Sequence, residues 1–138
     1  MPEAFNVRIL TPMGEVADAT AVYVRARATD GLVGVMARHA PMLTRLGIGP
    51  IVITEPGGDR RHFATVGGVL WVRRDGVVAL VEAAEEAAEI DVERARRALE
   101  RAQTRLREAR RGDIDVARAE LALSRARNRL RVAAHARG

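Results

Sequence analysis

The first 82 residues carry short runs in which apolar and polar side chains alternate, which is the two-residue period of a half-buried β-strand. Around Tyr23, for instance, small apolar residues alternate with Arg25 and Arg27. Turn-forming sequences such as TPMGE, EPGGD and RDG separate the runs. No helical pattern lies between them, so we expect about six to ten strands in an antiparallel β-sandwich or barrel, not a parallel βαβ sheet. The predicted strands include residues 5–10, 19–26, 50–54, 61–66, 68–73 and 76–81.

From about Glu82 the apolar period becomes that of a helix. The sequence IDVERARRALERAQTRL begins at Ile90. A second sequence, IDVARAELALSRARNRL, begins at Ile114 and has the same residue at eleven positions. Between the two, Gly112 is placed to end one helix, and Asp113 or Asp115 to cap the next. Each copy has an apolar stripe, made by Ala95, Ala98, Leu99, Ala102, Leu106 and Ala109 in the first and by Val116, Ala119, Leu123, Ala126, Leu130 and Ala133 in the second.

So short a connection predicts an antiparallel helical hairpin. The chain is then α+β, mainly β in its N-terminal part, with a β-sandwich domain over residues 1–84 and a hairpin domain over residues 85–138. Alanine stripes let two helices approach closely, but each alanine buries little area, at roughly 25 cal/mol per Å² of apolar surface. We therefore expect the hairpin to be only marginally stable, so that it could open or dock elsewhere.

Charge divides the chain at the same place. Nine arginines face eleven acidic residues before Ile90, and fourteen face seven from Ile90 onward, while lysine and cysteine are absent. The lack of cysteine excludes disulfides and thiolate sites and fits a reducing compartment. No apolar run reaches the roughly 18 residues that span a bilayer, and the N-terminus lacks a signal-peptide pattern. We therefore expect a soluble protein that could still dock on a membrane complex.

Residues that could carry catalysis are few. His39, His62 and His135 lie far apart and have no metal-ligand spacing, so we expect no metal site. The glycines form neither a dinucleotide-binding nor a P-loop motif, and no hydroxyl residue looks like a nucleophile flanked by a base and a group that orients it. The sequence EAAEEAAE, with Glu82, Glu85, Glu86 and Glu89, is more typical of a solvated linker or first helical turn than of paired catalytic acids. We expect a non-catalytic protein.

Six arginines recur at helical spacing in the hairpin: Arg94, Arg101, Arg105, Arg118, Arg125 and Arg129. They could be the solvated flanks of an amphipathic pair. Nucleic-acid binding is disfavoured, because the basic half has no aromatic residue to stack on bases and no recognition-helix motif. An acidic protein partner or a nucleotide phosphate remains open, since the arginine fork recognises carboxylates and phosphates.

Several longer motifs, taken together, carry a resemblance to a known family. They are VRILTPMGEV, GLVGVMARHAPML, FATVGGVLWVRRDGVVALVEAAEEAAEIDVERA and DIDVARAELALSRARNRLRVA. From about Phe5 to Ala133 the sequence resembles the epsilon subunit of bacterial F-type ATP synthase. The resemblance implies a rotor subunit of the central stalk, at the cytoplasmic face of the cell membrane and peripheral to it. Its sandwich would bind the gamma subunit and the c-ring. Its hairpin would have two poses. Folded down on the sandwich it would permit ATP hydrolysis, and extended along gamma toward the alpha and beta subunits it would inhibit hydrolysis.

The resemblance also implies a regulatory nucleotide site, with no cofactor required. Some members bind ATP through an I/L-D-x-x-R-A motif, which stands here as Ile90, Asp91, Arg94 and Ala95, supported by Glu85, Arg101, Arg125 and Arg129. Asp91 could equally cap the first helix, worth about 1 kcal/mol. In the extended pose the inhibitory basic face would comprise Arg118, Arg125, Arg127 and Arg129.

Two positions depart from the family pattern. Leu32 stands where an acidic residue is usual, and Ala37-Arg38 stands where Pro-Gly is common. The general c-ring contact region, residues 29–43, is carried over, but its individual contacts are not. The alternative to a rotor subunit is a free-standing β-domain whose basic hairpin serves as an adaptor for acidic proteins or nucleic acid.

Overall fold

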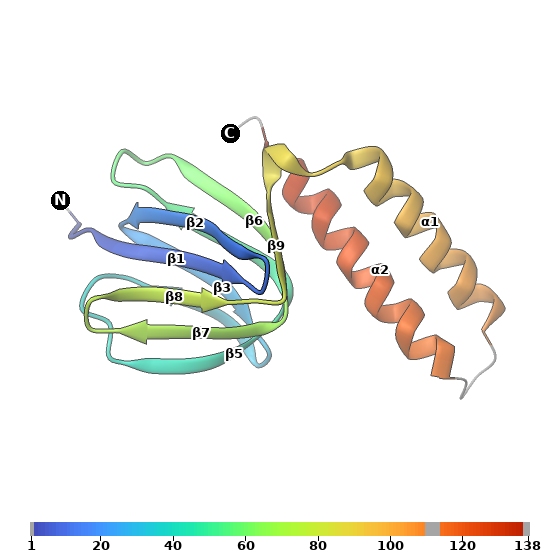
Figure 1. The fold of residues 1–138 in the computed structure, drawn as a ribbon, viewed down its shortest axis with the longest axis horizontal. Coiled ribbons are helices and arrows are strands. Elements are labelled where there is room, and N and C mark those ends of the chain that lie inside the picture. The colour runs from blue at the N-terminus through green and yellow to red at the C-terminus, as the bar shows by residue number, and fades with distance from the viewer. Residues whose placement is uncertain (1, 110–113, 137–138) are drawn as a thin grey trace.

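The computed structural model describes residues 2–109 and 114–136. Within them a β-sandwich is followed by two antiparallel helices, of which the second packs against one side of the sandwich and the first packs on the second (Figure 1). The strands are β1 (Phe5–Thr11), β2 (Gly14–Ala21), β3 (Tyr23–Ala28), β4 (Gly31–Val35), β5 (Met42–Thr54), β6 (Arg60–Val66), β7 (Gly68–Arg73), β8 (Gly76–Leu80) and β9 (Ala83–Glu86). A 3₁₀ turn, η1 (Ala87–Glu89), then leads to helices α1 (Val92–Glu108) and α2 (Ile114–Ala133). The predicted fold class is confirmed.

All these strands belong to one hydrogen-bonded sheet that folds back on itself in the order β2-β1-β8-β7-β5-β3-β4, with β6 paired to β5 and β9. The long strand β5 joins the two layers, because its first part pairs with β7 and its last part with β3 and β6. One pairing differs from the antiparallel expectation: β1 and β8 run parallel, from Val7 beside Val77 to Leu10 beside Leu80. The chain reaches this geometry without a crossover helix, since six intervening strands make the connection.

The strand boundaries depart from prediction where turn-forming residues or small residues interrupt the pattern. The predicted strand 19–26 is divided at Val22, so that its parts belong to β2 and β3. Strand β5 is far longer than the predicted 50–54, because Gly47, Gly49 and Pro50 lie inside it without ending it. Strand β9 replaces the predicted linker or first helical turn over EAAEEAAE, and it extends the sheet two residues past the predicted domain boundary at 84.

The main core is enclosed by the two layers of the sandwich. Its largest fully buried side chains include Ile9 of β1, Ile51 and Ile53 of β5, Phe63 of β6 and Leu70 of β7. Gly68 is required where β7 approaches β8. Its φ is +114°, and a Cβ there would lie 1.9 Å from the backbone oxygen of Leu80. This position therefore excludes any side chain.

Alanines hold the helices together, as predicted. On α1 the buried side chains are Ala95 and Ala102, and on α2 the buried members of the predicted stripe are Ala119, Ala126 and Leu123. Asp91 caps α1, since its carboxylate accepts a hydrogen bond of 3.0 Å from the Arg94 backbone N–H. The predicted stop at Gly112 and the cap at Asp113 lie outside the described residues. Asp115 lies in the first turn of α2 and not at a cap position.

Candidate functional site

Helix α2 lies against the sandwich, and its interface with β6 and η1 forms the joint between the two parts of the chain. A small apolar cluster of Ala64, Ala87, Ile90 and Val132, with Ala133 at its edge, fills this joint. It is separate from the main core of the sandwich. At about 25 cal/mol per Å², so few small side chains contribute little compared with that core. Polar contacts therefore decide much of how α2 is held.

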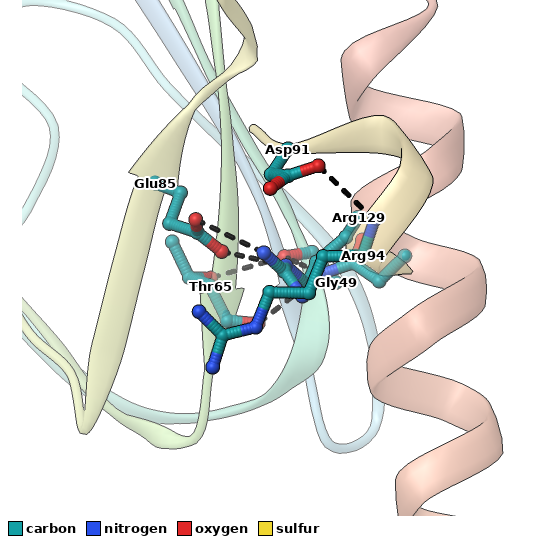
Figure 2. A network of polar contacts seen from close by, with 7 residues as sticks. Gly49, Thr65, Glu85, Asp91, Arg94 and Arg129 are labelled. Atoms are coloured by element: carbon teal, nitrogen blue, oxygen red, sulfur yellow. Dashed lines mark hydrogen bonds and ion pairs between the residues drawn. The ribbon is translucent and has the colours of Figure 1, made fainter. Parts of the chain in front are cut away.

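A buried amide connects α2 to the sandwich. Asn128 is 6% exposed, and its side-chain Nδ2 donates to the backbone oxygens of Gly49 at 3.1 Å and Thr65 at 3.3 Å. The Thr65 hydroxyl donates to the same Gly49 oxygen at 3.0 Å (Figure 2). The single amide thus satisfies backbone groups of β5 and β6 at the point where the helix crosses them. Sequence reasoning missed Asn128, because one polar residue within an arginine-rich helix has no distinguishing pattern.

An ion pair lies beside this amide. Arg129 of α2 donates through Nε to Glu85 Oε1 at 2.6 Å and through a terminal nitrogen to Oε2 at 3.2 Å. The Arg129 side chain is 22% exposed and that of Glu85 is 39% exposed. Two parallel bonds to one carboxylate orient the guanidinium toward β9. The structure thus brings together two residues of the predicted nucleotide site that come from opposite ends of the C-terminal part.

The motif residues of the predicted nucleotide site lie at the same joint. Figure 2 shows Asp91 and Arg94, where α1 begins, close to Glu85 and Arg129. Ile90 is 7% exposed and packs in the apolar cluster, and Ala95 is fully buried against α2. These residues therefore have structural roles in the docked hairpin, as a helix cap, a cluster member and a seam residue.

The remaining predicted arginines lie elsewhere. Arg101 lines a shallow hollow on α1, together with Arg97, Glu100 and Arg105. Arg125 and Arg127 line a groove of about 770 Å³ between α2 and the sandwich. Arg118 lies beside Glu108 and Asp115 toward the far end of the hairpin. The predicted site thus divides into a compact group at the joint, Glu85, Ile90, Asp91, Arg94, Ala95 and Arg129, and two outlying arginines, Arg101 and Arg125.

A second ion pair fixes β9 to the sheet. Arg61 on β6 donates to both carboxylate oxygens of Glu86, each at 2.8 Å. The hydrogen bond from Arg61 is the main cause that holds the pKa of Glu86 below its usual range, while partial burial opposes it. The pKa of Arg61 is raised by the same bond. Neither residue was predicted to pair, because strand β9 itself was not predicted.

Exposed apolar residues gather in the region expected to contact a partner. Leu32 is 65% exposed, Met36 is 57% exposed and Leu43 is 67% exposed. Leu43 also lies directly opposite Trp71 in the pairing of β5 with β7, and Trp71 is 45% exposed. Arg38 has a φ of 65°, in the left-handed region that glycine adopts most readily. Its backbone therefore keeps the conformation that the family's common Pro-Gly would favour.

The described part of the chain contains neither a membrane-spanning helix nor a cluster of metal ligands. Over residues 2–109 and 114–136, none of the helices is long and apolar enough to cross a membrane. Over the same residues, no group of three or more metal-ligating side chains comes together. His62 and His135 do come together as a pair, although they lie far apart in the sequence.

Comparison with known proteins agrees with the resemblance. Residues 4–87 match the family described as ATP synthase, Delta/Epsilon chain, beta-sandwich domain. Residues 88–134 match its long alpha-helix domain. The ATP synthase epsilon chain of Carboxydothermus hydrogenoformans is 45% identical over 106 residues, which cover 77% of this chain and 78% of that one. The epsilon chain of Solibacter usitatus is 41% identical over 103 residues, which cover 75% and 76%.

Solved structures share the fold at lower identity. A chain of the Euglena gracilis mitochondrial ATP synthase, in an assembly of OSCP, F1 and c-ring, superposes with a TM-score of 0.81 at 22% identity, covering 98% of this chain and 84% of that one. A chain from the central stalk and c-ring of the Tetrahymena thermophila enzyme gives 0.51 at 16% identity, covering 97% and 96%. With both of its parts matched in order and curated relatives above 40% identity, the chain belongs to the ATP synthase delta/epsilon chain family.

Proposed function

We propose that the chain is a non-catalytic rotor subunit of a bacterial F-type ATP synthase, and that its hairpin restrains ATP hydrolysis by leaving and rejoining the sandwich. The observation that carries this proposal is the character of the joint. The main core lies within the sandwich. Helix α2 is instead held by a small apolar cluster, by the Asn128 amide and by the partly exposed Arg129–Glu85 ion pair. An element held in this way can detach without exposing the main core, which a two-position switch requires.

In this proposal the sandwich is the fixed platform and contacts gamma and the c-ring. The exposed side chains of Leu32, Met36 and Leu43 support a docking surface in the c-ring contact region, because burying apolar side chains in a complex lowers the free energy. The subunit would lie at the cytoplasmic face of the membrane and reach it only through the complex. The extended hairpin would present Arg118, Arg125, Arg127 and Arg129 to acidic segments of alpha and beta, and Arg129 would first have to leave Glu85.

The restraint is tested in the assembled enzyme. Deletion of residues 91–138 should raise ATP hydrolysis while gamma and the c-ring still assemble, because the platform keeps its core. A variant with Arg118, Arg125 and Arg127 changed to glutamine should also release hydrolysis. The matched control changes three arginines of α1, Arg96, Arg97 and Arg107, to glutamine and should leave inhibition nearly intact. Unchanged hydrolysis after the deletion would remove the proposed role.

We further propose that ATP is a regulatory ligand of the docked hairpin. The cationic groups of Arg94 and Arg129 near Asp91 and Glu85 support it, because a phosphate group can compete with the Glu85 carboxylate for the Arg129 fork. A ligand that binds only the docked pose stabilises that pose by its differential affinity. The outlying Arg101 and Arg125 would reach the same phosphates only by changing rotamer or by a small shift of the helices.

Thermal unfolding of the isolated chain with and without ATP tests this second proposal. At a concentration of 100 times the dissociation constant, a bound ligand stabilises by about 2.7 kcal/mol. Arg125→Ala with Arg129→Ala should abolish the shift that ATP causes, measured relative to the same variant without ATP. Arg96→Ala with Arg107→Ala serves as the charge-matched control and should keep the shift. A wild-type chain with no shift would exclude ATP as the ligand here.

A further inference from the structure

Two histidines meet where the end of α2 rests on the sandwich. His62 belongs to β6, and His135 follows the last turn of α2, where its backbone N–H donates to the Val132 oxygen at 2.9 Å. Their rings stack with centroids 4.0 Å apart and planes within 5° of parallel. The pair connects the two parts of the chain, so its geometry exists only while the hairpin is docked.

The surroundings of the pair are strongly basic. It lies in a groove of about 710 Å³ that also receives Arg25 and Arg27 from β3, Arg60 from β6 and Arg131 from α2. Asp59, in the turn before β6, is the carboxylate among the groove's lining residues. In the described part of the chain none of these four arginines has an ion-pair partner. A proton on either imidazole therefore adds positive charge to a groove that already has an excess of it.

The direction of the proton linkage follows from His62. Burial is the main cause that lowers the pKa of His62, followed by the charges of His135, Arg25 and Arg60. When α2 detaches, burial and the approach of His135 are lost, and the pKa returns toward about 6.5. Because the pKa of His62 is higher in the detached state than in the docked state, the detached state binds more protons once the pH falls below about 6.5, in the window between the two pKa values. Docking is accordingly strongest above about pH 6.5 and weakens as the pH falls through that window.

We propose that the stacked His62–His135 pair is a pH-sensitive latch, which holds the end of α2 on the sandwich while the His62 ring is neutral and releases it on acidification. The latch is a property of the chain itself and does not depend on the proposed role in ATP synthase. In an assembled synthase it would shift the hairpin toward the undocked pose as the cytoplasm becomes acidic. One titrating group can change the detached-to-docked ratio by at most about tenfold per pH unit.

The chain has no cysteine, so two introduced cysteines can be labelled without background. Gly57→Cys lies in the turn before β6 with open space around it, and Ala134→Cys lies exposed at the end of α2. Spin labels there report the distance between sandwich and helix end. At about pH 8 we expect one short, narrow distribution, and at about pH 5.5 a second, longer component. A distribution that does not change between these pH values overturns the latch.

Matched variants separate the histidine pair from other acid effects. His62→Phe keeps a flat ring for stacking but cannot bind a proton, so its distribution should stay short at both pH values. His39→Gln removes a histidine outside the groove and should keep the wild-type response. If His62→Phe still opens with acid, the proton acts elsewhere and the proposal fails.

A direct titration covers the case in which His62→Phe packs poorly. The ring proton resonances of His62 in the full-length chain give its apparent pKa by NMR. That pKa should lie below about 6.5 in the wild type. It should move upward in His135→Gln, because the neighbouring ring and its charge are removed. An apparent pKa at or above 6.5 in the wild type, or no movement in His135→Gln, would contradict the latch.

Discussion

At the scale of single residues, the Asn128 side chain connects α2 directly to the backbone of the sandwich. It donates to two backbone oxygens that belong to different strands, and it is buried where the helix crosses them. Removing one partner of a buried hydrogen bond leaves the other unsatisfied, at a cost of about 1–3 kcal/mol. A loss of that size would be a large part of the free energy that docks α2 on the sandwich, because the apolar cluster beside Asn128 is small.

Asn128→Ala should therefore loosen the docked hairpin without unfolding the sandwich. We expect faster hydrogen exchange across the second half of α2, with an unfolding midpoint for the sandwich that changes little. Asn128→Asp should have a larger effect, because a carboxylate would face the oxygens of Gly49 and Thr65. Ser124→Ala, which changes an exposed residue one turn before Asn128 in the same helix, is the control. Equal exchange in Asn128→Ala and wild type would show that the amide contributes nothing to docking.

Gly68 sets a stricter requirement within the sandwich. A Cβ there would meet the Leu80 backbone oxygen at 1.9 Å, and the φ of +114° is itself unfavourable for any other residue. Backbone strain alone costs on the order of 1–3 kcal/mol, before the clash is counted. We expect Gly68→Ala to lower the thermal unfolding midpoint sharply or to prevent folding. Gly57→Ala, with no neighbour within 4 Å and no positive φ, should unfold close to the wild-type temperature.

At the scale of elements, β9 shows where composition misleads. Glutamate and alanine favour helices, so EAAEEAAE is read as a linker or first helical turn. The segment is a strand because β6 offers it backbone partners from Phe63 to Val66, and because Arg61 binds Glu86 through two bonds. These contacts come from residues about twenty positions earlier, which no local pattern can reveal. Tertiary pairing has overridden local propensity here.

The Glu86 carboxylate makes this element sensitive to acid. Its pKa is lowered in the folded chain, chiefly by the hydrogen bond from Arg61, so the unfolded chain binds more protons at low pH. The pair's contribution is full above the unfolded value of about 4.3 and is lost as the pH falls through the lower folded value. We expect Glu86→Gln to flatten part of the loss of unfolding free energy below about pH 4.5, measured by urea titration. Glu120→Gln, on the exposed side of α2, should leave that slope unchanged.

The other elements divide in the same way between local and non-local causes. Strands β6 and β7, which are short apolar runs bounded by turn-forming residues, and both helices with their alanine stripes were predictable, because the pattern that marks each of them is local. Strand β5 was not, since Gly47, Gly49 and Pro50 resemble breakers in isolation, yet they lie where the strand passes from one layer to the other. The parallel pairing of β1 with β8 was also hidden, because alternation is the same in both orientations.

At the scale of the whole molecule, the described residues form two apolar clusters of very different size, one inside the sandwich and one at the joint. The residues of the predicted nucleotide site were named through family resemblance, and the structure places most of them at the joint. The contacts that hold them, through Asn128 and the His62–His135 stack, could not be read from sequence, because each joins residues more than sixty positions apart.

This division of cores predicts how the chain unfolds. A chain truncated after Ile90 should keep a cooperative thermal transition close to that of the full-length sandwich, because residues 5–81 supply nearly all of the main cluster. In the full-length chain, circular dichroism at 222 nm should lose helical signal before or with the fluorescence change of Trp71 and never after it. A truncated chain that fails to fold would show that α2 is part of the sandwich's own core.

The parallel pairing of β1 with β8 also has a consequence for synthesis. Strand β1, which is made before the other described strands, lies between β2 and β8, so its second edge stays open until residues 76–80 have been made. Closing so long a loop is slow compared with forming a hairpin. Helix α2, made after all of these strands, packs on a surface of β5, β6 and β9 that is complete only after this closure. The order of translation therefore completes the sandwich before the hairpin that docks on it, so a nascent chain cannot present a docked hairpin on an unfinished sandwich.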